Sequence, residues 1–318
     1  MPVKVELTPP DISDYEAGNT GISYYTTFDS GEPGPHILIN AVTHGNELCG
    51  AITVDFLFRH NVRPTRGQLS LGFANYMAYQ NFNPAAPKAS RYVDEDFNRL
   101  WSHDVLNGPR DSVELRRARE LRPFIETVDF LLDLHSMQQA CPALILSGPL
   151  AKGRALASGV GYPAHIVSDI GHAAGKRMRD YGAFSDPDSP KNALLVECGQ
   201  HWEADSAVVS LETTLRFLRH LNAIEPAFAA AHLPAAPPAP QCFIEVTEAV
   251  TVRSPEFSFT QPFRGMEVIP KAGDIIGHDG DTPLCAPYDD CVLIMPSQRL
   301  YPGQTAVRLG RFLDGPTP

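Results

Sequence analysis

Two histidines and a glutamate in this sequence have the residue types and the spacing to hold a metal ion. His44 and Glu47 lie three residues apart directly after an apolar run, and His135 ends a second apolar run at residues 129–135. Side chains three apart on the first turn of a helix point to the same side, so this pair could grip one ion while a distant strand supplies the third ligand. Two imidazoles and one carboxylate are the ligand set of catalytic zinc sites, which keep a fourth position open for water or substrate.

The spacing alone is weak evidence, because the chain contains eleven histidines and a His-x-x-Glu pair can arise by chance. The location of the His44–Glu47 pair strengthens the interpretation as a metal site. Residues 36–41 read as a buried strand and residues 47–60 as the helix that follows, which puts the pair on a loop at the carboxyl end of a strand. Open α/β sheets bind their ligands at that end. The sequence therefore predicts one Zn²⁺ per chain, bound by His44, Glu47 and His135.

The elements that must position these residues alternate along the chain. Apolar, β-branched runs predict strands at residues 36–41, 68–75, 129–135, 142–147, 164–168 and 192–198. Helical patterns between and after them predict helices at residues 47–60, 112–126, 150–160, 171–181 and 204–222, the second capped by Asp111 or Ser112 with Glu114. This alternation predicts an α/β fold with a mostly parallel sheet covered by helices.

A stretch rich in Pro and Ala at residues 226–240 interrupts this pattern, because proline cannot continue a helix. Beyond it, short strand-like pieces are punctuated by Gly and Pro. We therefore expect a catalytic domain at residues 1–225, a linker at 226–240 and a small β domain at 241–318. The alternative is that the linker is a surface excursion within one compact unit.

Composition narrows the class of protein. With 43% apolar and 20% charged residues, 318 residues can bury a full core. The net charge of −11 argues against a nucleic-acid partner, which would need clustered Lys and Arg. The start of the chain has no signal-peptide pattern and no apolar segment is long enough to span a bilayer, so we expect a cytoplasmic protein without a membrane partner. Six cysteines without a Cys-x-x-Cys pair indicate reduced, buried thiols.

A zinc hydrolase also needs a base and cationic groups. Glu197, at the end of an apolar strand, could exchange protons with water and the leaving nitrogen if partial burial raises its pKa. The alternative is a structural glutamate paired with an arginine. Arg91 and Arg99 flank a cluster of acids in a long irregular segment, and Asn98 adds a neutral donor. An arginine fork suits a carboxylate, although a solvated loop with surface ion pairs is the alternative.

Two further polar residues lie near these candidates. Asp133 projects from the same strand face as His135, either as the partner of that histidine or as a buried hydrogen-bond acceptor. His201 has no ligand-like spacing and is expected to be structural or exposed, although it closely follows Glu197.

In chain order, four separated motifs resemble the signature of the aspartoacylase/succinylglutamate desuccinylase family: Thr43-His44-Gly45-Asn46-Glu47, Arg91-Tyr92 with Asp96-Phe97-Asn98-Arg99, Asp133-Leu134-His135, and Val196-Glu197-Cys198-Gly199. The resemblance covers nearly the whole chain. It implies a zinc-carboxypeptidase-like mixed sheet covered by helices, followed by a small C-terminal β domain that covers the active site. It also implies hydrolysis of N-acyl amino acids, with a metal-bound water as the nucleophile.

The resemblance assigns roles to individual residues. It implies that His44, Glu47 and His135 bind zinc, and that Glu197 handles the protons of the water and the leaving group. It implies that Arg91 polarises the scissile carbonyl, and that Asn98 and Arg99 hold a substrate carboxylate. A tyrosine of the C-terminal domain reaches the site in this family. Tyr301 is the better match, with Tyr288 as the alternative.

One departure from the family bears on the substrate. Aspartoacylases carry an arginine in the loop before the base glutamate, and residues 183–190 contain none, which argues against acetylaspartate. The expected activity is therefore a zinc-dependent deacylase of a small N-acyl amino acid. The alternatives are a metallocarboxypeptidase acting on short peptides and a non-catalytic binding protein on the same fold. A small-molecule substrate is the expected partner, and assembly into a homo-oligomer stays open.

Overall fold

The computed structural model describes residues 4–171 and 174–313. The helices are α1 (Leu48–Arg59), α2 (Tyr76–Gln80), α3 (His103–Asn107), α4 (Val113–Ile125), α5 (Ala151–Val160), α6 (Ala204–His220) and α7 (Pro226–His232). Short 3-10 turns occur at η1 (Ser13–Tyr15), η2 (Phe97–Arg99), η3 (Met178–Asp180) and η4 (Gly182–Ser185).

The strands are β1 (Tyr25–Asp29), β2 (His36–Ala41), β3 (Gln68–Phe73), β4 (Phe130–Met137), β5 (Leu144–Leu146), β6 (His165–Ser168), β7 (Asn192–Gln200), β8 (Cys242–Thr251), β9 (Phe257–Phe259), β10 (Val268–Ile269), β11 (Ile275–Asp279), β12 (Thr282–Cys285), β13 (Cys291–Ile294) and β14 (Thr305–Phe312).

Eleven of these strands form one mixed sheet in the order β1-β3-β2-β4-β7-β5-β6-β8-β14-β13-β10. Its centre is parallel, because β2 pairs in parallel with both β3 and β4, and β4 pairs in parallel with β7. The register places Asn40 beside Asp133, and His135 beside Glu197. Three polar strand ends therefore meet at one edge of the sheet.

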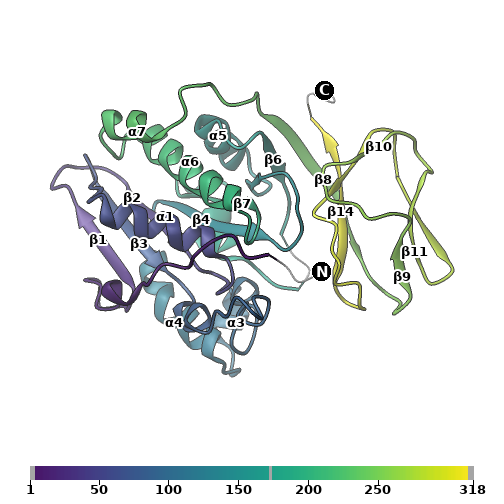
Figure 1. Cartoon of the computed structure of the whole chain (residues 1–318), viewed down its shortest axis with the longest axis horizontal. Coiled ribbons are helices and arrows are strands. Elements are labelled where there is room, and N and C mark those ends of the chain that lie inside the picture. Colours follow the sequence, from purple (N-terminus) through teal and green to yellow (C-terminus); the bar gives the residue numbers. More distant parts are fainter. Residues whose placement is uncertain (1–3, 172–173, 314–318) are drawn as a thin grey trace.

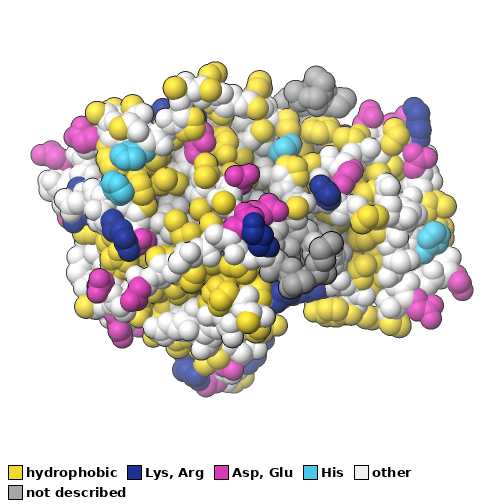
Figure 2. All heavy atoms as spheres, in the orientation of Figure 1, with side chains coloured by type: hydrophobic (Ala, Val, Ile, Leu, Met, Phe, Trp, Pro, Cys, Tyr) yellow, Lys and Arg dark blue, Asp and Glu magenta, His cyan; other side chains and the backbone are white. Residues whose placement is uncertain are grey.

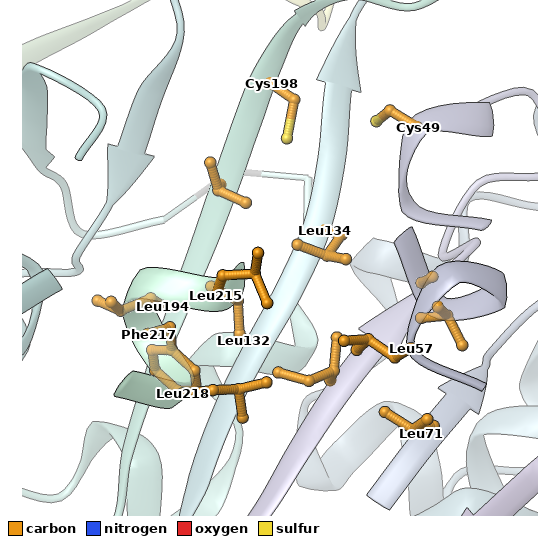
Figure 3. Close-up of a cluster of buried hydrophobic side chains, with 14 of the residues drawn as sticks. Cys49, Leu57, Leu71, Leu132, Leu134, Leu194, Cys198, Leu215, Phe217 and Leu218 are labelled. Carbon is orange, nitrogen blue, oxygen red and sulfur yellow. The ribbon is translucent and has the colours of Figure 1, made fainter. Parts of the chain in front are cut away.

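Helices cover both faces of the sheet, as Figure 1 shows for α1 and α6 on one face and α4 on the other. Alternate residues of one strand face opposite layers: Ile37 and Ile39 join the cluster under α1 and α6, whereas Leu38 joins the cluster under α4. Figure 3 draws the first cluster, where Leu132, Leu134 and Leu194 of the sheet meet Leu57, Leu215, Phe217 and Leu218 of the helices. Each fully buried leucine contributes about 1.5–3 kcal/mol, so this layer fixes the strand ends.

The C-terminal strands continue the same sheet. Strand β8 pairs in parallel with β6, and β14, β13 and β10 follow it by antiparallel pairing. Strands β12, β11 and β9 form a separate three-stranded sheet in the yellow-green part of Figure 1. The predicted fold class, a helix-covered mixed sheet followed by a small β region, is confirmed. The division into domains at 1–225 and 241–318 stays a prediction.

Two expectations for the elements are wrong. Residues 226–232 of the expected linker form the helix α7, which Pro226 can begin because its missing N–H needs no partner in a first turn. The expected helix at 171–181, of which 172–173 lie outside the described residues, is an isolated bridge from Lys176 to Leu100 followed by the turn η3. Gly175 has a φ of +142° and packs against the Arg99 carbonyl, where a helical glycine could not lie.

Charged side chains are scattered on the face drawn in Figure 2, where Lys and Arg alternate with Asp and Glu. Neither sign dominates this face. Among the helices of the described residues, none has the length and apolar character needed to cross a membrane.

Candidate metal centre and active site

The three predicted ligands lie together in the folded chain. His44 and Glu47 come from the turn between β2 and α1, and His135 from β4. His44 Nδ1 is 2.7 Å from Glu47 Oε1, and His135 Nδ1 is 2.9 Å from Glu47 Oε2. One ligand atom from each residue lies within 4.8 Å of the others, and all three side chains are buried. The pair lies just before the helix rather than on its first turn, since Glu47 is the N-cap of α1.

Two backbone features shape this turn. Val42 has a φ of +62°, a left-handed conformation that costs a β-branched residue about 1–3 kcal/mol. Gly45 lies so close to the backbone of Ala78 and Ser90 that a Cβ atom would overlap both. The Gly45 N–H donates to the Arg91 carbonyl at 3.1 Å, which ties the ligand turn to the arginine segment. Contacts with neighbouring segments therefore hold this turn in a backbone conformation that its own residues disfavour.

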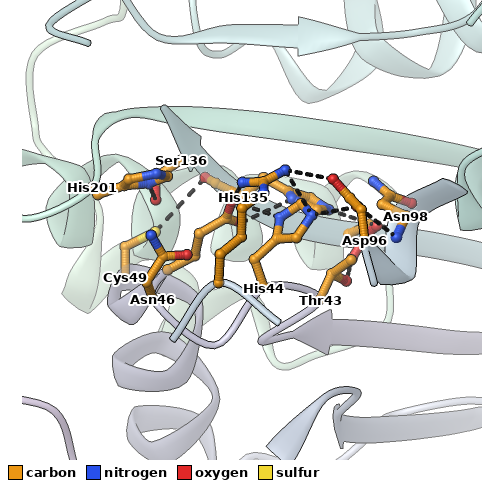
Figure 4. A network of polar contacts seen from close by, with 12 residues as sticks. Thr43, His44, Asn46, Cys49, Asp96, Asn98, His135, Ser136 and His201 are labelled. Atoms are coloured by element: carbon orange, nitrogen blue, oxygen red, sulfur yellow. Dashed lines mark hydrogen bonds and ion pairs between the residues drawn. The ribbon is translucent and has the colours of Figure 1, made fainter. Parts of the chain in front are cut away.

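Carboxylates fix the outer nitrogens of both histidines, as Figure 4 shows for His44 and Asp96. His44 Nε2 is 2.9 Å from Asp96 Oδ1, and His135 Nε2 is 2.8 Å from Asp133 Oδ2. Asp133 Oδ1 accepts from Asn40 Nδ2 at 2.7 Å and Thr43 Oγ1 at 2.9 Å. Asp133 thus has both roles considered for it, and each imidazole turns its Nδ1 toward Glu47.

The donor set fits a divalent metal such as zinc. Burial disfavours the charged form of Glu47, yet His44 and His135 hold the pKa of this carboxyl well below its usual value. Burial likewise opposes protonation of His135, but Asp133 and Glu47 raise the pKa of this imidazole well above its usual value. Cationic groups are therefore favoured around the Glu47 carboxylate. A metal ion in the same place would supply that charge and leave the histidines neutral, as ligation requires.

The arginine segment is anchored rather than solvated. Arg91 Nη2 donates to Asp96 Oδ2 at 3.0 Å, and Arg91 Nη1 lies 3.6 Å from Glu47 Oε1. The buried Glu114 of α4 accepts from the backbone N–H groups of residues 93–95 at 2.6, 3.0 and 3.2 Å. Glu114 was expected to help cap α4, but the Ser112 hydroxyl is the cap and Glu114 pins this loop.

Asn98 and Arg99 line the cavity beside Arg91. Asn98 Oδ1 accepts from the Met178 N–H at 3.0 Å, which fixes the orientation of the amide. Arg99 Nη1 donates to the Asn98 carbonyl at 2.7 Å. Burial lowers the pKa of Arg99 to about 10, so this guanidinium stays charged at neutral pH.

Glu197 lies beside His135 at the end of β7. Burial, with a smaller contribution from the nearby Glu47, raises the pKa of Glu197 to about 8. Its Oε2 has no hydrogen-bond partner, and no lysine, arginine or histidine pairs with it at 4.0 Å or less within residues 4–171 and 174–313. The alternative of a glutamate paired with an arginine is therefore wrong, and a carboxyl with a raised pKa next to a metal centre suits acid and base chemistry.

One cavity of about 360 Å³ is lined by the three candidate ligands, the arginine segment, Glu197 and Tyr301. Tyr301 is 51% exposed at its wall, whereas Tyr288 lies away from this lining, hydrogen-bonded to Thr247 Oγ1 at 2.6 Å. Of the two candidate tyrosines, Tyr301 is therefore the one placed at the cavity.

Several residues of this cavity carried no signal in the sequence. His201 is buried in its wall, with Nδ1 2.8 Å from Ser136 Oγ, so the expectation of a structural histidine describes only part of its position. Arg177 and Arg308 also line it. Asp96 was quoted in the Asp96-Phe97-Asn98-Arg99 motif without a role of its own, and no spacing rule links it to His44, which lies 52 residues earlier.

Comparison with known proteins gives a family match. A family model described as the succinylglutamate desuccinylase/aspartoacylase catalytic domain matches residues 33–221, more than half of the chain. An N-acyl-aromatic-L-amino acid amidohydrolase (carboxylate-forming) of Homo sapiens is 35% identical over 116 residues, 33% of this chain and 34% of that protein. A probable aspartoacylase of Parasynechococcus marenigrum (strain WH8102) is 36% identical over 132 residues, 39% of this chain and 41% of that protein. Both matches span less than half of the relative's length.

Solved structures share the fold over most of the chain. A succinylglutamate desuccinylase from Vibrio cholerae has a TM-score of 0.66 at 17% identity, covering 92% of this chain and 86% of that chain. A product-bound ectoine utilization protein from Ruegeria pomeroyi has a TM-score of 0.62 at 14% identity, covering 92% of each chain. At these identities the likeness concerns the fold.

Gly45→Ala should disrupt the ligand turn, because the new Cβ would overlap the backbone of Ala78 and Ser90. We expect metal affinity to fall by roughly 10-fold or more and stability by about 1–3 kcal/mol. Metal titration and urea unfolding measure both. Gly31→Ala is the control for metal affinity: nothing lies within 4 Å of its added Cβ, and although its φ of +78° should cost about 1 kcal/mol of stability, metal affinity should not change. Unchanged metal affinity in Gly45→Ala would contradict the role given to this glycine.

The raised pKa of Glu197 predicts a pH dependence of stability in the metal-free protein. The folded chain keeps this proton up to pH about 8, whereas the unfolded chain loses it near the ordinary value of 4.5. Between these values the folded state binds one more proton, so raising the pH favours unfolding by up to about 1.4 kcal/mol per pH unit. Urea unfolding of chelator-treated protein at pH 5, 6 and 7 should show this slope relative to Glu197→Gln. Parallel curves would rule out a proton held by Glu197.

Proposed function

The chain belongs to the succinylglutamate desuccinylase/aspartoacylase family, and we propose that it is a zinc-dependent enzyme that hydrolyses the amide bond of a small N-acyl amino acid. The observation that carries the proposal is the meeting of His44, Glu47 and His135 with Glu197 and Arg91 in one cavity. The relative in Homo sapiens is named as an N-acyl-aromatic-L-amino acid amidohydrolase (carboxylate-forming), which supports an amide substrate.

In this proposal one Zn²⁺ is held by His44, Glu47 and His135. When bound, zinc would act as a Lewis acid that polarises a carbonyl group and lowers the pKa of water. The buried carboxylates behind both imidazoles support such a site, because they hold the Nδ1 atoms in place before any ion arrives.

The remaining residues would handle protons and charge. Glu197 takes a proton from the attacking water and delivers it to the leaving nitrogen, a role that its raised pKa supports. Arg91, held by Asp96, stabilises the negative charge that develops on the carbonyl oxygen. Asn98 and Arg99 hold the substrate carboxylate through a neutral amide and a guanidinium fork.

The size and cover of the cavity support a small substrate. A volume of about 360 Å³ is near the lower end for small-molecule sites. Tyr301 and the loop before β14 also line the cavity, so the small β region at 241–318 would restrict access for peptides. A chain of several residues would meet this wall.

Replacing His44 or His135 by Ala should abolish stoichiometric zinc, because two ligands cannot hold the ion in a site built for three. Metal analysis of purified protein by mass spectrometry measures the ratio, with one zinc per chain expected for the unaltered protein. His103→Ala is the matched control, since His103 is exposed and outside the cavity. Full zinc content in His44→Ala or His135→Ala would remove those histidines from the ligand set.

Glu197→Gln should keep zinc but lower turnover by roughly 10²-fold or more, the usual scale for a positioned acid or base. Release of free amine from acetyl, succinyl and longer N-acyl amino acids, beside blocked dipeptides, measures it. Glu256→Gln, an exposed glutamate in the C-terminal part, is the matched control. Hydrolysis of blocked dipeptides alone would favour a carboxypeptidase, and near-full activity of Glu197→Gln would exclude this residue from catalysis.

A further inference from the structure

His201 is a buried imidazole of the cavity wall with one ring nitrogen engaged and the other unmatched. It directly follows β7, the strand that carries Glu197. Its Nδ1 lies 2.8 Å from Ser136 Oγ. Within residues 4–171 and 174–313, its buried Nε2 has no hydrogen-bond partner. A buried polar atom without a partner is costly, so this nitrogen indicates an atom that the cavity is built to accept.

The contact with Ser136 indicates which ring nitrogen carries the proton. If Nδ1 donated, the hydroxyl proton of Ser136 would have no acceptor, since this contact is the only hydrogen bond of that hydroxyl among the described residues. If the hydroxyl donates to Nδ1, its proton is matched and the ring carries its own proton on Nε2. The second arrangement leaves fewer polar hydrogens unmatched, so it assigns an N–H donor to Nε2.

The surroundings of His201 suit hydrogen-bond donation rather than proton transfer. Burial lowers the pKa of His201 to about 3, so the imidazole is neutral near physiological pH and does not exchange protons there. Smaller contributions to this pKa come from Glu47 and Arg91, so the ring lies close to the metal centre and to that arginine. The buried atoms Glu47 Oε2 and Glu197 Oε2 do not accept from Nε2. The donor is therefore available to a bound molecule.

Neighbouring contacts fix the ring in place. The His201 backbone N–H donates to the Met137 carbonyl at 2.8 Å, which ties it to the end of β4. The rings of His201 and Trp202 lie 5.2 Å apart, and Trp202 Nε1 donates to the Asn46 carbonyl at 3.1 Å. Figure 4 shows His201, Ser136 and Asn46 on the same side of the ligand cluster. The segment that holds this imidazole is thus bound to the ligand turn.

A fixed donor beside a metal centre suits an oxygen that gains negative charge during the reaction. From this geometry we propose that His201 is a further catalytic residue, whose Nε2–H donates to the carbonyl oxygen of the scissile amide beside Arg91. The inference rests on the proposed function. Arg91 supplies a cation held by Asp96, and His201 adds a neutral donor that needs no reorganisation. Ser136 is then a positioning residue, because its hydroxyl keeps the ring proton on Nε2.

His201→Asn and His201→Gln form a matched pair, because an Asn amide reaches only the place of Nδ1, whereas a Gln amide can put an N–H where Nε2 lies. His201→Asn should lower kcat by roughly 10²-fold with unchanged zinc content, the usual scale for one lost donor to a developing oxyanion. His201→Gln should recover roughly 10-fold of that loss. Equal kcat in the two variants would overturn the donor and assign His201 a structural role.

His165→Asn is the control, since His165 lies half-buried on β6 outside the cavity and its replacement should leave kcat unchanged. Thermal unfolding checks that each variant folds. Should His201→Asn not fold, His201→Phe takes its place in the comparison with His201→Gln, because it keeps a buried ring without a donor.

Calorimetric binding of a tetrahedral anion separates this inference from the proposed function. The probes are the methylphosphonamidate of alanine, whose phosphoryl oxygens imitate the attacked carbonyl, and free alanine, which has no acyl oxygen. In zinc-loaded protein, His201→Asn should weaken phosphonamidate binding by roughly 10- to 100-fold and leave alanine binding nearly unchanged. This result would support the donor even if no amide were cleaved. Unchanged phosphonamidate binding in His201→Asn would overturn the donor, and amide hydrolysis by the same preparation would leave the proposed function intact.

Discussion

The buried carboxylate of Glu47 imposes the main electrostatic demand on this part of the chain. A charged carboxylate that is 1% exposed is stable only when cations or strong donors surround it, and the two histidine Nδ1 atoms at 2.7 and 2.9 Å provide them. Glu197 is buried beside the same centre without such partners. The environment therefore pushes the two pKa values apart, lowering that of Glu47 and raising that of Glu197 to about 8. This difference separates a ligand from a base.

The register of the surrounding sheet places the partners that this buried carboxylate needs. Parallel pairing of β2, β4 and β7 places Asn40 beside Asp133 and His135 beside Glu197 at one sheet edge. Asp133 can then bind Asn40 and Thr43, which lie 93 and 90 residues earlier in the chain, together with its neighbour His135. The strained φ of Val42 is tolerated because these bonds, and the contact of Gly45 with its neighbours, hold the turn.

The sequence predicted those parts of the fold and site that depend on local pattern. His44 and Glu47 could be found because they lie close together after a strand, and His135 and Glu197 because each ends an apolar run. Glu114 and Asp96 act through partners distant in the chain, which no spacing rule relates to them. The helix expected at 171–181 was wrong because Gly171 and Gly175 have positive φ, which a helix does not allow. The roles of the site residues and the domain boundary stay predictions.

Because the sheet is continuous, two parts of the chain supply side chains to the cavity. Every proposed metal ligand and proton carrier lies before residue 200, whereas Arg308 comes from β14, which enters beside β8. Arg308 pairs in register with Ala249 on one side and Ile294 on the other, so its backbone cannot shift without breaking two ladders. The paired strand therefore keeps this guanidinium in a fixed place at the cavity, independent of the ligand turn.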